Sequence, residues 1–137
     1  MNLILYEQAV KLRQSEGFVP HEIVEAIDRF SSKQLDDLHF GVIELSDEGL
    51  ILQYNRYEQE LAGRRIQDVL GLSFFSDVAP CAQKPIFSGL FFFGVQRGQL
   101  DCMISYYFDF HMQPTHVWIH MYQNPKTRRN WLFVLRK

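Results

Sequence analysis

Three apolar runs of strand length close the chain, and they constrain its fold more than any other feature. The runs cover residues 101–112, 115–123 and 130–136. The link between the last two, "QNPKTRR", has the composition of a turn. We therefore expect three consecutive antiparallel strands at this end of the chain.

A second strand signal lies in the first half of the chain. The stretch "FGVIELSDEGLILQYN" covers residues 40–55 and places two apolar runs around Asp47, Glu48 and Gly49. Two apolar runs around such a turn signal indicate a β-hairpin. Together with the three C-terminal strands, the hairpin predicts one five-stranded antiparallel sheet.

Helical patterns account for most of the remaining chain. In the N-terminal part, Ser31 and Gln34 have the spacing of a capping box, which indicates the start of a short helix. A later helix is expected to end at Gly94 or Gly98. The segments compatible with helix are residues 3–14, 21–30, 31–40, 56–75 and 87–98.

This order of elements predicts an α+β domain whose short helices cross the face of the sheet. Residues 1–39 are expected to form an N-terminal helical cap, and residues 40–137 the core. The chain has 137 residues, enough for one domain with a substantial core. We find no internal repeat or linker that would divide it further.

Composition and charge narrow the range of functions. The formal net charge is −2, which gives no reason to expect nucleic acid or an anionic membrane as a partner. Aromatic residues make up 15% of the chain, which suits either a bulky core or a pocket for a flat aromatic ligand. Two cysteines, with no recognisable secretory leader or membrane-spanning stretch, predict a cytoplasmic protein with reduced thiols.

The two cysteines differ in their surroundings. Cys81 lies between two prolines in "VAPCAQKP", on what should be a rigid and irregular loop. It is either a small apolar filler, a common role for a free cysteine, or the attachment point of another group. Cys102 lies in a predicted strand and has no role assigned beyond packing.

Tyr54 and Glu58 are four residues apart, so their side chains point to the same side if the chain turns helical after Tyr54. A phenol and a protonated carboxyl could both donate hydrogen bonds to one buried anion, and burial favours the protonated carboxyl. The alternative is a capping box in "NRYE", with Asn55 as N-cap and Glu58 ionised in water. Spacing alone favours the cap. By default Arg64 is a solvated charge and Tyr54 a half-buried strand residue.

His116 and His120 share one face of a predicted strand with Trp118 and Tyr122. Because there is no third ligand at suitable spacing, we do not expect a metal site. This row is expected to lie under the N-terminal helices or at a contact between subunits. The sequence carries no phosphate-binding loop, metalloprotease helix or nucleophile elbow, and nothing local supports Cys81 as a catalytic thiol, so we do not expect an enzyme.

Five stretches of this sequence resemble the photoactive yellow proteins, a family of blue-light receptors with the PAS fold. The similarity runs from about residue 18 to the end of the chain, and the cysteine in "DVAPC" is its most specific part. The stretches are "GLILQYN" with Glu58 after it, "AGR" at 62–64, "DVAPC" at 77–81, "YYFDFHMQPTHV" at 106–117 and "WLFVLRK" from 131.

The resemblance implies a cofactor and a mechanism. Cys81 would carry trans-p-coumaric acid as a thioester, and the backbone N–H of Cys81 would hold its carbonyl. Tyr54 and Glu58 would donate hydrogen bonds to its buried phenolate, with Glu58 protonated in the dark. Blue light would drive trans–cis isomerisation, proton transfer from Glu58 and release of the N-terminal cap as a signal to a partner protein that the sequence does not identify. Arg64 would shield this pocket, and Phe108 and Met112 would line it.

The chain also departs from the family pattern. Ala62 stands where threonine is frequent, which removes a hydrogen-bond partner from Tyr54 and should alter colour and recovery rate. Tyr57 and Gln59 are bulkier than the small residues that usually flank the glutamate. Further departures are Phe110 in place of tyrosine, and Trp118 and Leu135 in place of basic residues.

The first 17 residues have no counterpart in the family, and with the more apolar sheet face they suggest either tighter docking of the cap or a homodimer. The two subunits of such a dimer would contact each other through the N-terminal cap or through the row of His116, Trp118 and His120. A different function stays open beside the photoreceptor. The chain could be a PAS module without chromophore that binds another ligand or senses redox state through Cys81.

Overall fold

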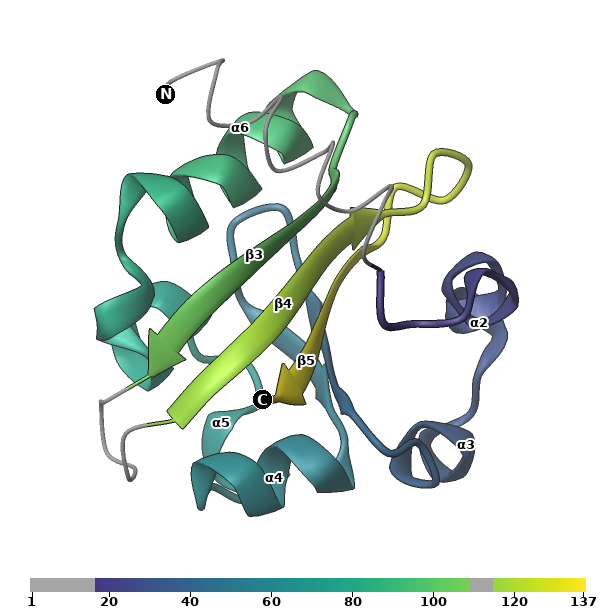
Figure 1. Cartoon of the computed structure of the whole chain (residues 1–137), viewed down its shortest axis with the longest axis vertical. Helices are drawn as coiled ribbons and strands as arrows, with labels where there is room; N and C mark the ends of the chain where they lie inside the picture. Colours follow the sequence, from purple (N-terminus) through teal and green to yellow (C-terminus); the bar gives the residue numbers. More distant parts are fainter. Residues whose placement is uncertain (1–16, 109–114) are drawn as a thin grey trace.

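The computed structural model describes residues 17–108 and 115–137 (Figure 1). The helix predicted at 3–14 lies outside the described residues, as do Phe110 and Met112.

A five-stranded sheet forms the centre of the molecule, with strand order β2-β1-β5-β4-β3 and antiparallel pairing throughout. The first two strands are the predicted hairpin, and Gly49, with φ +87°, lies in its turn. The third predicted run contributes the middle strand of the sheet. The strands are β1 (Gly41–Leu45), β2 (Ile51–Tyr54), β3 (Asp101–Phe108), β4 (Thr115–Gln123) and β5 (Asn130–Arg136).

The main hydrophobic core lies between one face of the sheet and the segment that connects β2 to β3. Alternate residues of β4, among them Val117, Ile119 and Met121, point into this core because side chains alternate across a strand. The last helix of the segment ends at Gly98, whose φ of +67° is the left-handed conformation that favours glycine at this position. The helices are α4 (Arg56–Ala62), α5 (Ile66–Val69) and α6 (Leu90–Arg97), with single helical turns at Phe74–Val78, Pro80–Ala82 and Pro85–Gly89.

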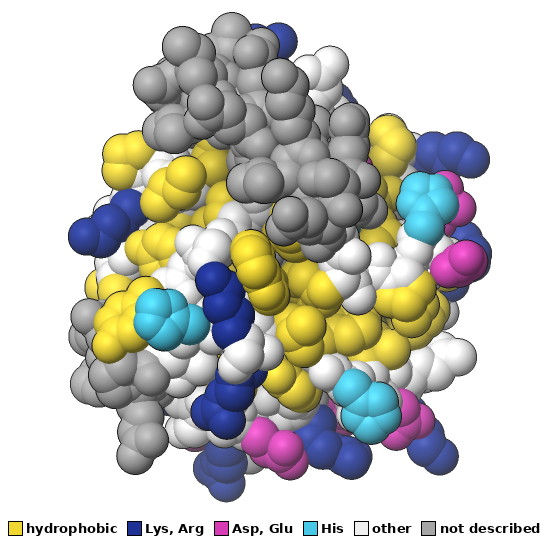
Figure 2. Space-filling model, in the orientation of Figure 1, with side chains coloured by type: hydrophobic (Ala, Val, Ile, Leu, Met, Phe, Trp, Pro, Cys, Tyr) yellow, Lys and Arg dark blue, Asp and Glu magenta, His cyan; other side chains and the backbone are white. Residues whose placement is uncertain are grey.

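The other face of the sheet packs against the N-terminal segment, which contains α2 (His21–Ala26), a turn at Ile27–Arg29 and α3 (Ser32–Asp36). The predicted capping box begins α3, because Ser31 Oγ accepts from the Gln34 N–H at 3.2 Å and Gln34 Oε1 accepts from the Ser31 N–H at 2.8 Å. On this face Figure 2 shows hydrophobic side chains gathered over the centre, with charged side chains around them. The N-terminal cluster consists of the buried residues Val19, Val24, Ile27, Leu35, Phe40, Val42, Trp131 and Phe133.

A polar network also joins the N-terminal segment to the sheet. The Trp131 indole N–H donates to Asp28 Oδ1 at 2.7 Å, and the Arg129 guanidinium donates to the Asp28 carbonyl at 2.9 Å. Arg129 also donates to both Glu44 oxygens, at 2.8 and 3.0 Å, and these bonds raise the pKa of the guanidinium. Asp28 therefore connects the segment directly to β5, and Arg129 extends the network to Glu44 in β1.

The row of aromatic side chains on β4 is not uniform. His116 is exposed and Trp118 half-buried, whereas His120 is fully buried and its Nε2 lies 2.8 Å from Asp101 Oδ1. The His120 ring lies 5.3 Å from that of Phe133, a member of the N-terminal cluster. The expectation that the row lies under the N-terminal segment thus holds at His120. A homodimer through this row stays a prediction, as does the division at residue 40.

Within the part of the chain that the structure describes, no helix is long and apolar enough to cross a bilayer. The same residues contain no group of three or more side chains placed to hold a metal ion.

Candidate functional site

Asn55 makes the chain turn from β2 into α4. Its side-chain oxygen accepts from the Glu58 N–H at 3.2 Å, as an N-cap does, and also from the Val42 N–H at 2.9 Å. Its amide nitrogen donates to the Leu35 and Phe40 carbonyls, at 2.8 and 3.0 Å. Because Asn55 caps α4 directly after Tyr54, the side chains of Tyr54 and Glu58 lie close enough for the Glu58 charge to act on Tyr54, as the spacing predicted.

The capping-box interpretation of Glu58 is wrong. The Asn55 backbone N–H donates to the Val42 carbonyl at 3.0 Å and not to the Glu58 carboxyl. The Glu58 side chain is instead buried, with 5% of its surface exposed, and its Oε1 has no hydrogen-bond partner among the described residues. Burial raises the pKa of this carboxyl to about 8. At neutral pH Glu58 is therefore mostly protonated and can donate a hydrogen bond.

Gly41 provides the space for this carboxyl. A Cβ atom at position 41 would collide with Glu58 Oε1 and would also meet the Val134 side chain at 3.2 Å. Sequence reasoning missed this contact. The signal for it was a glycine at the start of a strand, which often marks a close approach of another group to the backbone.

Tyr54 ends β2 and is buried, with 2% of its surface exposed. Burial is the largest cause that raises the pKa of its hydroxyl far above the ordinary value, and the nearby Glu58 carboxyl adds to it. The Arg64 guanidinium opposes this shift. Arg64 itself is half-buried, in the link between α4 and α5. Tyr54 thus stays a protonated donor, with one acid and one cation close enough to affect its titration.

Cys81 lies in the helical turn Pro80–Ala82 and is half-buried against the main core, so it is not a fully buried filler. The Tyr106 hydroxyl donates to the Cys81 carbonyl at 2.5 Å and fixes this turn against β3. Cys102 is fully buried, and burial raises the pKa of its thiol to about 12. The two thiols are both free and differ in their access to solvent.

Aromatic rings line the core beside Cys81. The ring centroids of Phe87 and Tyr106 are 5.0 Å apart, and those of Tyr106 and Phe108 are 5.6 Å apart. Phe108 and Tyr54 belong to the buried cluster against which Cys81 and the half-buried Ala62 pack. Tyr106 was missed by sequence reasoning, although it shares a strand face with Phe108, which was chosen.

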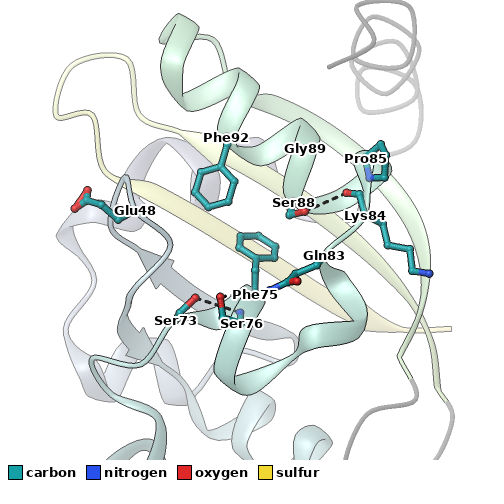
Figure 3. Close-up of a pocket in the computed structure, with 10 residues that line it drawn as sticks. All are labelled: Glu48, Ser73, Phe75, Ser76, Gln83, Lys84, Pro85, Ser88, Gly89 and Phe92. Atoms are coloured by element: carbon teal, nitrogen blue, oxygen red, sulfur yellow. Dashed lines mark hydrogen bonds between the residues drawn. The ribbon is translucent and has the colours of Figure 1, made fainter.

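A separate open groove of about 580 Å³ lies between the β1–β2 turn and the segment after Cys81 (Figure 3). The rings of Phe75 and Phe92 lie next to each other in its wall, with centroids 5.4 Å apart. Of the site residues chosen from the sequence, those that the structure describes do not line this groove.

The structure brings Tyr54, Glu58 and Arg64 together, and it places Cys81 and Phe108 on the same core cluster as Tyr54. Two neutral donors, a partly exposed thiol and a wall of aromatic rings suit a flat aromatic acyl group that bears a negative charge. The Glu58 oxygen without a partner is the kind of buried polar atom that such a group would satisfy.

Comparison with known proteins shows which proteins the chain is related to. No family model matches it. It is 44% identical to the photoactive yellow protein of Rhodothalassium salexigens over 119 residues, which are 87% of this chain and 95% of that protein. It is 40% identical to the photoactive yellow protein of Halochromatium salexigens, with the same coverage.

Comparison with solved structures shows the same relationship. The photoactive yellow protein domain of the sensor histidine kinase Ppr from Rhodospirillum centenum matches with a TM-score of 0.76 and 41% identity, over 80% of this chain and 96% of that domain. The PAS domain of an HTR-like protein from Haloarcula marismortui matches with a TM-score of 0.57 and 14% identity, over 82% of this chain and 98% of that domain, which shows the fold alone. The chain therefore belongs to the photoactive yellow protein family, whose members are photoreceptors rather than enzymes and have the PAS fold.

Proposed function

We propose that this protein is a blue-light photoreceptor that carries trans-p-coumaric acid as a thioester on Cys81. The observation that supports this most is the pair of buried, protonated donors, Tyr54 and Glu58, with a Glu58 oxygen that has no partner among the described residues. A cysteine that packs against the same cluster and remains partly exposed provides a point of attachment.

The bound group supplies a light-absorbing double bond and a phenolate, and the protein holds that charge away from water. A buried anion without partners is costly, so it needs strong donors. Tyr54 and Glu58 are these donors because each is kept protonated by its surroundings. The half-buried Arg64 side chain is proposed to shield the chromophore pocket from solvent. Phe108, Ala62 and Met112 are assigned to the walls of the pocket.

Glu58 is also the group whose ionisation can change the conformation of the protein. If Glu58 gave its proton to the phenolate, a carboxylate would be left in a dry site against Gly41, and an unpaired buried charge would favour opening. The Glu58 N–H is bonded to Asn55, which also binds Leu35 and Phe40 in the N-terminal segment. Release of the N-terminal cap is therefore the proposed signal, and a downstream signalling protein the proposed partner.

The proposed place of action is the cytoplasm, where the Cys81 thiol stays reduced and available for acylation. The partial exposure of Cys81 also favours a second candidate, a redox-sensing PAS module without chromophore. The two candidates differ in what they require of Tyr54 and Glu58, since a redox switch has no use for two buried donors.

The test is reconstitution of the purified protein with an activated p-coumaroyl ester. Wild type and Cys102→Ala should gain a blue absorption band that bleaches under blue light and recovers in darkness, and Cys81→Ala should gain none. An adduct that absorbs only in the near-ultraviolet would contradict the roles of Tyr54 and Glu58. Absence of any adduct, with reversible oxidation of Cys81, would favour the redox module.

A further inference from the structure

We propose that Gln59 is a positioning residue that holds the link carrying Arg64 against the end of β2 that carries Tyr54. The proposal concerns the proposed chromophore site, and its spectroscopic consequences rest on the proposed function. Its structural basis lies in the protein chain alone and can be tested without the chromophore.

The Gln59 side chain joins two segments that are separate in the sequence. Its amide nitrogen donates to the Tyr54 carbonyl at 3.2 Å, and its Oε1 accepts from the Ile66 N–H at 3.0 Å. The Gln59 carbonyl also accepts from the Gly63 N–H and, at 3.1 Å, from the Arg64 N–H. One residue therefore contacts the end of β2, the link and the start of α5.

The contact with Ile66 replaces a cap that α5 lacks. This helix has only four residues, and its N-cap residue, Arg65, makes no side-chain capping bond. Short helices are marginal on their own, and their first N–H groups need partners from outside the helix. Gln59 supplies such a partner to the first residue of α5, so it fixes where the link from Gly63 to Arg65 lies.

The position of this link determines how strongly the charge of Arg64 acts on Tyr54. Arg64 is half-buried, and its charge opposes the rise in the Tyr54 pKa that burial causes. A link free to move would let the Arg64 guanidinium swing into water, where its interaction with a buried anion is weaker. Because the hydrogen bond from Gln59 goes to the Tyr54 carbonyl and not to the phenol, we expect Gln59 to act on the phenol through Arg64.

The first test is amide hydrogen exchange on the full chain without chromophore. In Gln59→Ala the amides of Arg64 and Ile66 should exchange about 5- to 30-fold faster, as expected for the loss of one or two partly buried hydrogen bonds. Amides in the middle strand β5 should not change. Gln67→Ala, in the exposed face of α5, is the matched control and should leave the Arg64 and Ile66 rates as they are.

A second variant separates the two side-chain bonds. Gln59→Glu keeps an acceptor for the Ile66 N–H but loses the donor to the Tyr54 carbonyl, so it should protect Ile66 better than Gln59→Ala does. Unchanged exchange at Arg64 and Ile66 in Gln59→Ala would overturn the proposal. An equal acceleration in β5 would also overturn it, because Gln59 would then serve overall stability only.

The second readout is the pH at which the blue band of the reconstituted protein bleaches in the dark. This midpoint should rise in Gln59→Ala, because a displaced Arg64 stabilises the anion less, and it should not move in Gln67→Ala. A midpoint unchanged in Gln59→Ala would overturn the positioning role. If wild type forms no blue band, the proposed function fails, whereas the exchange result still decides whether Gln59 holds the link.

Discussion

The carboxyl of Glu58 lies against the backbone of Gly41, at the residue where the N-terminal segment enters the sheet. The neighbours of Gly41 in the sequence, Phe40 and Val42, both belong to the N-terminal cluster. A change of charge at Glu58 therefore acts on the backbone that anchors this segment.

Substitution of Gly41 by alanine should displace the Glu58 carboxyl. The added Cβ collides with Oε1, and overpacking of this kind costs about 1–3 kcal/mol of unfolding free energy. The reconstituted protein should also show a shifted blue band. Urea unfolding and an absorption spectrum measure the two effects.

Gly71→Ala is the matched control for this change. Position 71 has a positive φ, +82°, which position 41 does not, and a Cβ there meets nothing within 4 Å. The substitution therefore adds backbone strain without displacing a side chain, and the position of the blue band should not change. Equal spectra for Gly41→Ala and wild type would contradict the proposed contact.

The stability of the protein without chromophore should fall as pH rises from about 4.5 to about 8, the interval between the ordinary and the folded pKa of Glu58. The folded state binds the Glu58 proton more tightly than the unfolded state, so the unfolding free energy decreases as this proton is lost. The total change is on the order of a few kcal/mol. In urea titrations across this pH interval, Glu58→Gln should abolish this decrease in the unfolding free energy. If the unfolding free energy changed with pH equally in wild type and in the variant, the burial of an ionisable carboxyl would be contradicted.

Asp28→Ala should loosen the N-terminal segment, because the buried Trp131 indole N–H loses its acceptor. An unsatisfied buried donor costs about 1–3 kcal/mol. Trp131 fluorescence, measured in a Trp118→Phe background, should change its emission maximum in the same variant. Asp37→Ala, an exposed position in the same segment, should change neither quantity. Identical emission in the Asp28 variant would show that the contact does not hold the segment.

Thiol reactivity should distinguish the two cysteines in the folded protein. Cys81 is half-buried, whereas Cys102 is fully buried and the pKa of its thiol is raised to about 12, so the reactive thiolate is scarce there. One thiol should react with a neutral aromatic disulfide in wild type and in Cys102→Ala. None should react in Cys81→Ala until the protein unfolds, and rapid reaction of that variant would contradict the burial of Cys102.

Local patterns were sufficient to predict much of the fold. The capping box of Ser31 and Gln34, the hairpin around Gly49 and the end of α6 at Gly98 each depend on residues close in sequence, and all three are present. Apolar runs separated by turn signals indicated the strands for the same reason.

The site was harder to predict because its decisive contacts join distant residues. The pattern "NRYE" correctly marked Asn55 as an N-cap, but the burial of Glu58 depends on the space left by Gly41. Tyr106 reaches the Cys81 carbonyl across 25 residues of sequence. Local spacing carries no information on either contact, so the ionised cap looked better than the buried acid.

The central claim is that Glu58 is protonated in the dark and loses its proton after light is absorbed. Light-minus-dark infrared difference spectroscopy on the reconstituted protein tests it most directly, with Glu58→Gln as control. We predict that illumination removes the carbonyl band of a protonated carboxylic acid in wild type, and that the variant lacks this change. A carbonyl band that light leaves unaltered, or one that disappears equally in Glu58→Gln, would contradict the account.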